Sequence, residues 1–186
     1  MAKLSYRLLG KDIQKEIDKN PFLIGRQGDN NLLLSDVQVS RYHTMIFRYE
    51  NGLYIIDHSV NGTYFSPKDK SRSGPERLSS SLDSKAFIEF KSQQSIRAGA
   101  QAESSEKESL PKIPGFKQHK FQIKEDIQYL IEMVAVPEQA RELLTGGGRR
   151  LVHEDVFYIP CKEQTDPSKT IEFLFIDTSF NPGASS

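Results

Sequence analysis

Between Lys3 and Phe90 the apolar residues come in short runs that are rich in β-branched and aromatic types, and clusters of turn residues separate the runs. Runs of this length and composition are typical of β-strands. The dipeptide Asn51-Gly52 lies between two of them and is the strongest hairpin signal in the chain, since a type I′ turn needs positive φ at its central residues. The pattern predicts an all-β sandwich of two antiparallel sheets at the beginning of the chain.

The predicted strands of the sandwich follow these runs along the sequence. They are Leu4–Leu9, Ile13–Ile17, Phe22–Gly25, Asn31–Leu34, Thr44–Tyr49, Tyr54–Asp57, Gly62–Phe65 and Phe87–Phe90, with Ser95–Arg97 as a further short strand.

The domain organisation follows from changes in composition along the chain. Residues 1–97 are assigned to the sandwich, with the Ser-, Lys- and Pro-rich segment 66–85 as a surface insertion. Residues 98–114 contain almost nothing to bury and are predicted to be a linker. Residues 115–180 are predicted to form a small α+β unit, and residues 181–186 a disordered tail.

The predicted α+β unit begins with helical spacing of apolar residues and ends with two strands. Ile127, Leu130, Ile131 and Val134 recur at helical intervals, and Pro137 is suited to the first turn of a second helix that ends near Leu144. Gly146-Gly147-Gly148 stops this helix. The predicted strands are Val152–Pro160 and Thr170–Asp177, which we expect to pair.

The charge balance of the chain gives no support for binding to nucleic acid or to a membrane. Lys and Arg together number 25, as do Asp and Glu, so no net field attracts a polyanion. No apolar run approaches the length of about 20 residues that spans a bilayer, and the first residues lack the apolar stretch of a secretory signal. We expect an intracellular protein, cytoplasmic or nuclear, with no membrane partner.

The single cysteine, Cys161, excludes an intrachain disulfide and a cysteine-rich zinc site, and it is interpreted as an inert structural thiol. The histidines lack the paired spacing of metal ligands, so no metal site and no cofactor are predicted.

Three short motifs occur in order along the chain: Gly25-Arg26 at a strand end, Ser40-Arg41-Tyr42-His43 before a strand, and Ser59-Val60-Asn61-Gly62-Thr63 between strands. Together with the residues between them, they resemble the forkhead-associated (FHA) family, over about residues 3–100. The resemblance implies a β-sandwich whose loops bind phosphothreonine in a partner protein or peptide. Because loops gather at the ends of a sandwich, these distant residues can converge on one surface patch.

Four residues are predicted to bind the phosphopeptide. Arg26 offers a planar guanidinium fork for the phosphate, and Ser40 offers a hydroxyl. Arg41 supplies a second cation to the phosphate or reads an acidic residue of the ligand. The resemblance assigns Asn61 to the backbone of the bound peptide, which its amide suits because it both donates and accepts.

Four further residues are expected to support the loops: Gly25, His43, Gly62 and Thr63. The resemblance makes His43 a buried brace for the loop that holds the phosphate. We therefore do not interpret His43 as a catalytic base, and the sequence contains no other part of a catalytic triad beside it.

The sequence departs from the family pattern at Val60, where a hydroxyl residue is common and valine cannot donate to phosphate. We expect modest affinity for this reason. The preference for phosphothreonine over phosphoserine is also implied only by the resemblance. Residues around Asp36–Val39 and Ser59–Val60 are expected to set the preference at the ligand position three residues after the phosphothreonine.

Two other classes of function remain as alternatives. The chain could act as an interaction or assembly protein that binds without phosphate, through its sheet edges and its C-terminal unit. An enzyme that uses His43 or the glycine-rich segment Thr145–Arg150 is disfavoured, because this segment lacks the lysine and hydroxyl ending of a nucleotide-binding loop. We expect an adaptor in phosphorylation signalling and not an enzyme.

Overall fold

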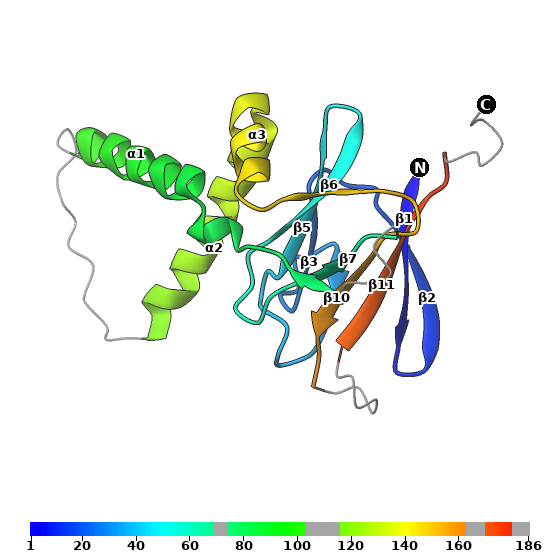
Figure 1. The fold of residues 1–186 in the computed structure, drawn as a ribbon. Helices are drawn as coiled ribbons and strands as arrows, with labels where there is room; N and C mark the ends of the chain where they lie inside the picture. Colours follow the sequence, from blue (N-terminus) through cyan, green and yellow to red (C-terminus); the bar gives the residue numbers. More distant parts are fainter. Residues whose placement is uncertain (69–73, 103–115, 163–169, 180–186) are drawn as a thin grey trace.

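Two β-sheets pack face to face, and three helices lie beside one of them (Figure 1). The computed structural model describes residues 1–68, 74–102, 116–162 and 170–179. One sheet has the strand order β2-β1-β11-β10-β7-β8, and the other has the order β4-β3-β5-β6-β9. All strand pairs are antiparallel except β3 with β4. The prediction of a β-sandwich is confirmed.

The strands of the first sheet are β1 (Ala2–Leu8), β2 (Lys11–Glu16), β7 (Tyr64–Ser66), β8 (Glu76–Arg77), β10 (Val156–Pro160) and β11 (Thr170–Asp177). The strands of the second sheet are β3 (Phe22–Gly25), β4 (Leu32–Leu33), β5 (Thr44–Tyr49), β6 (Gly52–Asp57) and β9 (Arg149–Leu151). The helical elements are a 3-10 turn η1 (Ser81–Asp83), α1 (Lys85–Ala102), α2 (Phe116–Ala135) and α3 (Pro137–Thr145).

The predicted hairpin joins β5 to β6, but its turn lies one residue earlier than the Asn-Gly pair suggests. Tyr49 pairs with Gly52, so the two loop residues are Glu50 and Asn51. Positive φ falls on Glu50, at 48°, and Gly52 is the first residue of the next strand. The register is therefore set by the pairing of the flanking strands. Gly52 belongs to β6 and is not one of the two turn residues.

The main core lies between the two sheets and is built from strands at both ends of the chain. Phe22 and Ile24 of β3 are fully buried in it together with Phe157 of β10 and Phe173 of β11. The rings of Phe157 and Phe173 stack with their centroids 4.8 Å apart. Alternate residues of these strands face this core, as the period of two in a strand requires.

The C-terminal strands belong to the sandwich, which corrects the expectation of a separate α+β unit over residues 115–180. β11 pairs with β1, β10 pairs with β7, and β9 extends the second sheet beside β6. The two predicted strands do pair with each other, from Val156–Leu174 to Pro160–Thr170. The local pattern predicted this hairpin correctly, but a hairpin with one apolar face needs a core, and here the core is the one between the sheets.

Helix α1 replaces the two strands predicted at Phe87–Phe90 and Ser95–Arg97. The side-chain oxygen of Ser84 accepts a hydrogen bond of 3.2 Å from the backbone N–H of Phe87, which satisfies one donor of the first turn. The segment is rich in Ala and Gln, which favour helices, and its short apolar run does not distinguish a strand from a helix. α1 extends to Ala102, into the predicted linker, and the rest of the linker lies outside the described residues.

The helices cover the outer face of the second sheet and form a second core. Met45 and Phe47 of β5 and Ile56 of β6 contact this cluster from the sheet. The helices contribute Phe87, Ile127, Leu130, Met133, Ala140 and Leu143. Both helices predicted after residue 115 are confirmed, and α3 begins with Pro137 and ends before the glycine run as expected.

The predicted surface insertion 66–85 is partly built into the structure. β8 pairs with β7, and Leu78 is buried in the main core. The hydroxyl of Ser81 donates to the carbonyl of Asp57 over 2.7 Å and attaches η1 to the end of β6. Residues 69–73 of this segment, and the predicted tail 181–186, lie outside the described residues. Among the helices of the described part, none is long and apolar enough to cross a membrane.

Candidate phosphopeptide site

Three loops meet at one end of the sandwich, and each carries one of the three sequence motifs. The loop after β3 contacts the loop before β5, because the backbone N–H of Arg26 donates to the carbonyl of Ser40 over 3.0 Å. The loop before β5 contacts the loop after β6, because the N–H of Val60 donates to the hydroxyl oxygen of Ser40 over 3.1 Å. Residues that are distant in the sequence are thereby brought together.

Arg26 is exposed at the first of these loops, and its guanidinium is held at one point. Its Nε donates to the carbonyl of Val39 over 3.0 Å. This bond fixes the direction of the side chain and leaves the two terminal nitrogen atoms without a partner among the described residues. A guanidinium held in this way presents its fork to a ligand at a low cost in side-chain entropy.

Gly25 is required by the close approach of these two loops. A Cβ atom at this position would lie 2.4 Å from the carbonyl oxygen of Arg41 and 2.9 Å from the Cα of Tyr42. Both are backbone atoms and cannot move independently of the loop. The supporting role predicted for Gly25 thus has a steric cause.

Ser40 and Arg41 contribute polar groups that are only partly used within the protein. The Ser40 hydroxyl oxygen accepts from Val60, so its own proton is available to donate. The Nη1 atom of Arg41 is buried and has no hydrogen-bond partner among the described residues. An unpaired buried donor is energetically costly.

His43 is fully buried and connects the loop before β5 to the loop after β6. Its Nδ1 accepts the N–H of Ser40 over 3.0 Å, so the ring proton is on Nε2, which lies 3.2 Å from the carbonyl of Gly62. Burial lowers the pKa of His43 to about 4, and the bond to Gly62 opposes this only in part. A neutral imidazole is what both contacts require, which agrees with a brace and not with a catalytic base.

Asp57 anchors the third loop from inside the protein. Its Oδ1 accepts from the hydroxyls of Thr63, over 2.7 Å, and Ser59, over 2.8 Å. The Ser59 oxygen in turn accepts the N–H of Gly62 over 2.8 Å. Burial raises the pKa of Asp57 to about 6, although these hydrogen bonds and the charge of Arg77 lower it. The sequence motif contained Ser59 and Thr63, but the acceptor that organises them is Asp57.

Asn61 lies at the exposed tip of this loop. One N–H of its amide donates to the carbonyl of Gln38 over 2.6 Å, and this bond connects the loop to the segment that precedes β5. The second N–H and the amide oxygen remain available. Gly62 follows with a φ of +86°, which a residue with a Cβ adopts only with strain.

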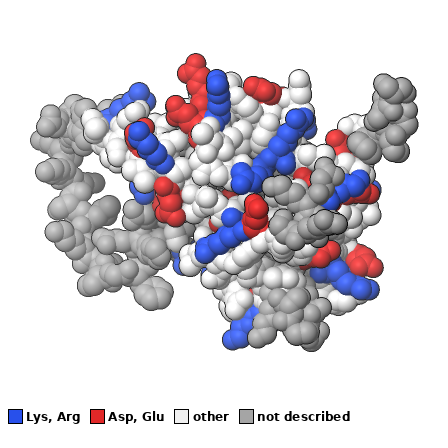
Figure 2. All heavy atoms as spheres, viewed as in Figure 1, with Lys and Arg blue, Asp and Glu red and all other residues white. Residues whose placement is uncertain are grey.

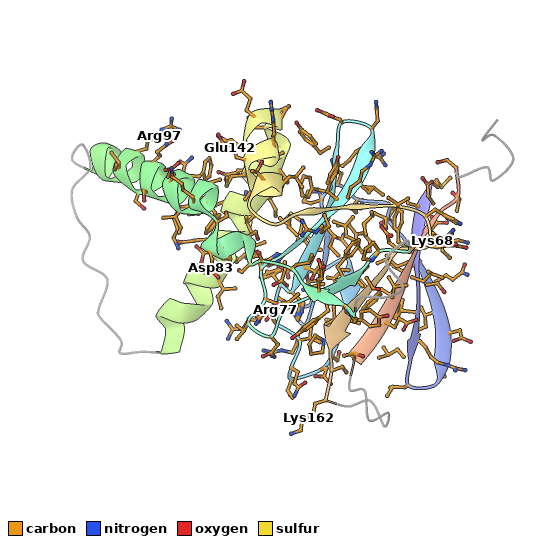
Figure 3. The ribbon with its side chains drawn as sticks, in the orientation of Figure 1. Lys68, Arg77, Asp83, Arg97, Glu142 and Lys162 are labelled. Carbon is orange, nitrogen blue, oxygen red and sulfur yellow. The ribbon has the colours of Figure 1, made fainter. Side chains whose placement is uncertain are left out.

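Arg77 is a cation near the site that the sequence did not indicate. It lies on β8, the edge strand of the first sheet, on the side of the sandwich nearest the helices (Figure 3). Its Nη2 donates to the carbonyl of Val60 over 3.1 Å, so it supports the same loop as Asn61. It comes from the segment that was predicted to be a mere surface insertion.

A cavity of about 480 Å³ opens between these loops and helix α2. All four residues predicted to bind the ligand line it, namely Arg26, Ser40, Arg41 and Asn61. The other side of the cavity is formed by the helical part of the chain through Leu82, Ile123, Asp126 and Ile127. The sequence predicted the first side and missed the second, because nothing local places a helix from residue 116 onward beside loops that end at residue 63.

His58 also lines this cavity, and the sequence suggested only a contact at its rim. It is 5% exposed, and neither ring nitrogen has a hydrogen-bond partner among the described residues. Burial, and then the charge of His43, lower the pKa of His58 to about 3, so the ring is neutral. It lines the cavity together with Ile123 and Ile127 of α2, a neighbourhood that the local sequence did not show.

The remaining candidates from the sequence have structural roles. Gly146 and Gly147 end α3, and a Cβ on Gly147 would lie 2.7 Å from the side chain of Ser79. Cys161 is buried, and its thiol donates to Oδ2 of Asp36 over 2.9 Å. In the described parts of the chain, no group of His, Cys, Asp or Glu side chains is arranged to hold a metal ion.

Charged side chains of both signs are interspersed on the face shown in Figure 2, without a patch of one sign. This agrees with the balanced composition. A site for one phosphate group therefore depends on a few positioned donors and not on a general basic surface.

The sequence was compared with protein families, with curated proteins and with solved structures. Residues 22–81 match the model of the FHA domain. No curated protein matches the chain.

Similar solved structures are FHA domains of low sequence identity. The N-terminal FHA domain of Rad53p from S. cerevisiae, in complex with a phosphothreonine peptide, is 9% identical, with a TM-score of 0.44 over 96% of this chain and 94% of that one. FHA-1 of Rv1747 from Mycobacterium tuberculosis is 10% identical, with a TM-score of 0.40 over 95% of this chain and 98% of that one. The FhaA FHA domain, complexed with the intracellular domain of Rv3910, is 13% identical, with a TM-score of 0.43 over 94% and 99%.

The matched residues 22–81 run from the first residue of β3 to the beginning of η1 and include all three motifs. Residues 22–81 are therefore similar to an FHA domain.

Proposed function

We propose that this chain is an interaction module, and not an enzyme, that binds phosphothreonine in a partner protein or peptide. The observation that carries the proposal is the convergence of Arg26, Ser40 and Arg41 on one cavity with donors that the protein itself does not use. A phosphate monoester carries about −1.5 to −2 charges at neutral pH and three acceptor oxygens. The three side chains offer donors of matching number and charge.

Each residue has a distinct part in the proposed complex. The fork of Arg26 pairs with two phosphate oxygens, and the Ser40 proton is donated to a third oxygen. Arg41, which lines the cavity, adds the second cation. The free N–H and the oxygen of the Asn61 amide bond to the peptide backbone beside the phosphoresidue. His43, Asp57 and Thr63 keep the three loops in this arrangement.

The proposal extends to phosphothreonine specifically because the FHA family has this preference and because FHA domains of similar fold have been solved with phosphothreonine peptides. Val60 brings no hydroxyl to the site, and we therefore propose a modest affinity.

Fluorescence anisotropy with an oriented library of phosphothreonine peptides tests the proposal. The wild type is compared with Arg26→Ala and with Arg26→Lys, which keeps the charge and removes the fork. Arg97→Ala is the matched control, because Arg97 lies on α1 away from the site (Figure 3). Loss of charge-assisted hydrogen bonds predicts that Arg26→Ala weakens binding about tenfold to a hundredfold.

The unphosphorylated and phosphoserine versions of the best peptide complete the experiment. We expect no binding of the former and weaker binding of the latter. Binding should also weaken with increasing salt, since part of the attraction is Coulombic. Equal binding by wild type and Arg26→Ala, or indifference to the phosphate, would remove the proposal and favour an interaction surface that works without phosphate.

A further inference from the structure

The cavity at the proposed phosphate site is larger than a phosphate group needs, and its far side is apolar. Ile123 and Ile127 of α2 and Leu82 of η1 form this side, opposite the loops that carry Arg26 and Ser40. The cavity is continuous from one side to the other. A ligand whose phosphate lies among the loops therefore has a neighbouring side chain within reach of α2.

His58 is the polar group of this apolar side. Its side chain is only 5% exposed, and both ring nitrogens lack a hydrogen-bond partner among the described residues. A neutral imidazole has one N–H donor and one acceptor nitrogen. Leaving both unpaired in a buried place is unfavourable, so a ligand group that pairs with them gains affinity.

The charges at the cavity argue against a charged ligand side chain in this place. Asp126 lines the cavity, but its carboxylate is already paired with the ammonium group of Lys91 over 2.5 Å. This pair leaves no net charge on the α2 side. Arg41 lies on the loop side, where the phosphate neutralises it. A buried charge without a partner is costly, so a neutral side chain fits better.

From this geometry we infer that the α2 side of the cavity is a second subsite, which takes a tyrosine side chain next to the phosphothreonine of the ligand. The aromatic ring packs against Ile123, Ile127 and Leu82. Its hydroxyl, which both donates and accepts, bonds to a ring nitrogen of His58 once the imidazole turns toward the cavity, since both nitrogens are closed to solvent in this structure. The inference rests on the proposed function, because the ligand is the same phosphopeptide.

The test uses the full chain and phosphothreonine peptides in which one position at a time carries Tyr, Phe, Ala, Asp or Lys in an otherwise constant small-residue background. For wild type we expect one flanking position at which Tyr binds about tenfold more tightly than Ala, since a large apolar surface is buried there. At that position Tyr should exceed Phe by about threefold to tenfold, as one hydrogen bond predicts.

Two variants assign the effect to this subsite. His58→Phe removes the ring nitrogens and sacrifices no internal hydrogen bond of the side chain, so it should abolish the advantage of Tyr over Phe. Ile123→Ala should reduce the advantage of both aromatic residues over Ala. Ile131→Ala is the matched control, because Ile131 is also a partly buried residue of α2 on the helical core but does not line the cavity.

The outcomes separate this inference from the proposed function. If binding depends on phosphate and on Arg26 but no flanking position prefers an aromatic residue, the subsite is refuted and the phosphate site stands. A preference for Asp or Lys, or a tyrosine preference that survives in both His58→Phe and Ile123→Ala, also refutes it. The ratio of Tyr to Phe in the wild type is decisive even if a variant fails to fold. Loss of phosphate dependence itself would instead refute the proposed function.

Discussion

The hydroxyl oxygen of Ser40 accepts a hydrogen bond of 3.1 Å from the backbone N–H of Val60. This bond joins two of the three loops of the site at Val60, the position at which the sequence departs from the FHA pattern. The side chain of Val60 is 84% exposed, so it contributes little to the fold. The loop keeps its position by a backbone hydrogen bond. The absence of a hydroxyl at position 60 therefore removes a donor to the ligand and no contact within the protein.

Val60→Thr should therefore restore a donor without disturbing the loop, since the two side chains have nearly the same shape. We expect phosphothreonine peptides to bind about threefold to tenfold more tightly, as one added hydrogen bond to a charged acceptor predicts. Isothermal calorimetry at constant salt measures the change. Val37→Thr is the control, because Val37 is an exposed valine of the same cavity. An equal gain in both variants would show that position 60 has no special relation to the phosphate.

Gly25→Ala should destabilise the protein, because the added Cβ would lie 2.4 Å from the carbonyl oxygen of Arg41. Backbone would have to shift, and we expect a loss of about 1–3 kcal/mol in the free energy of unfolding. Urea denaturation measures it. Gly28→Ala is the control, since no atom lies within 4 Å of a Cβ at that position, and we expect a change within about 0.5 kcal/mol. Two variants of equal stability would contradict the steric role of Gly25.

The strands with a clear pattern of their own were predictable from the sequence. Phe22–Gly25, Thr44–Tyr49 and Thr170–Asp177 have the predicted bounds. These segments combine β-branched and aromatic residues with flanking turn residues, so local information was sufficient. At Phe87 it was not, because a short apolar run does not distinguish a strand from a buried helical turn.

The residues of the candidate site also divide into those that a local sequence pattern indicated and those that it did not. Arg26, Ser40, Arg41 and Asn61 were found because their motifs occur together, and the structure brings these residues to one cavity. Their contacts with a ligand remain a prediction. The place of Ile123 at the cavity was not found, because it depends on where α2 packs. α2 shares a core with Met45, Phe47 and Ile56 of the second sheet, which lie far from it in the sequence, and no local pattern encodes this contact.

The stability of the protein should fall with decreasing pH, and His58 should account for part of the decrease. Burial lowers its pKa from 6.5 to about 3, so the unfolded chain binds more protons than the folded one between these values. His43 acts in the same direction down to about pH 4. Asp57 acts in the opposite direction, because its pKa is raised to about 6 and the folded state binds the extra proton between pH 3.8 and this value.

His58→Phe isolates the contribution of this histidine, since the other two groups are common to both proteins. The free energy of unfolding, measured by urea denaturation from about pH 7.5 to about pH 5, should decrease less steeply in the variant. The difference in slope should approach about 1.4 kcal/mol per pH unit at the acidic end, which corresponds to one proton. Parallel curves would mean that His58 titrates normally in the folded protein and is not buried as described.

A chain of residues 1–97 alone should not fold, although the sequence pattern assigned the whole sandwich to it. β10 and β11 lie in the middle of the six-stranded sheet, between β1 and β7, so their removal leaves two pairs of strands without a connection. Phe157, Phe173 and other fully buried side chains of the main core are lost with them. A two-stranded hairpin without a packed face is at best marginally stable in water.

Circular dichroism and urea denaturation of the fragment should show no cooperative transition. A chain that ends after Ser179 is the control; it keeps every strand, and we expect it to unfold cooperatively like the full chain. A fragment 1–97 with a cooperative transition would show that residues 1–97 carry a sufficient core without β10 and β11. Because each of these strands buries one face against β3 and β5 across the sandwich, the long-range pairing of β1 with β11 makes the sandwich dependent on the C-terminal residues of the chain.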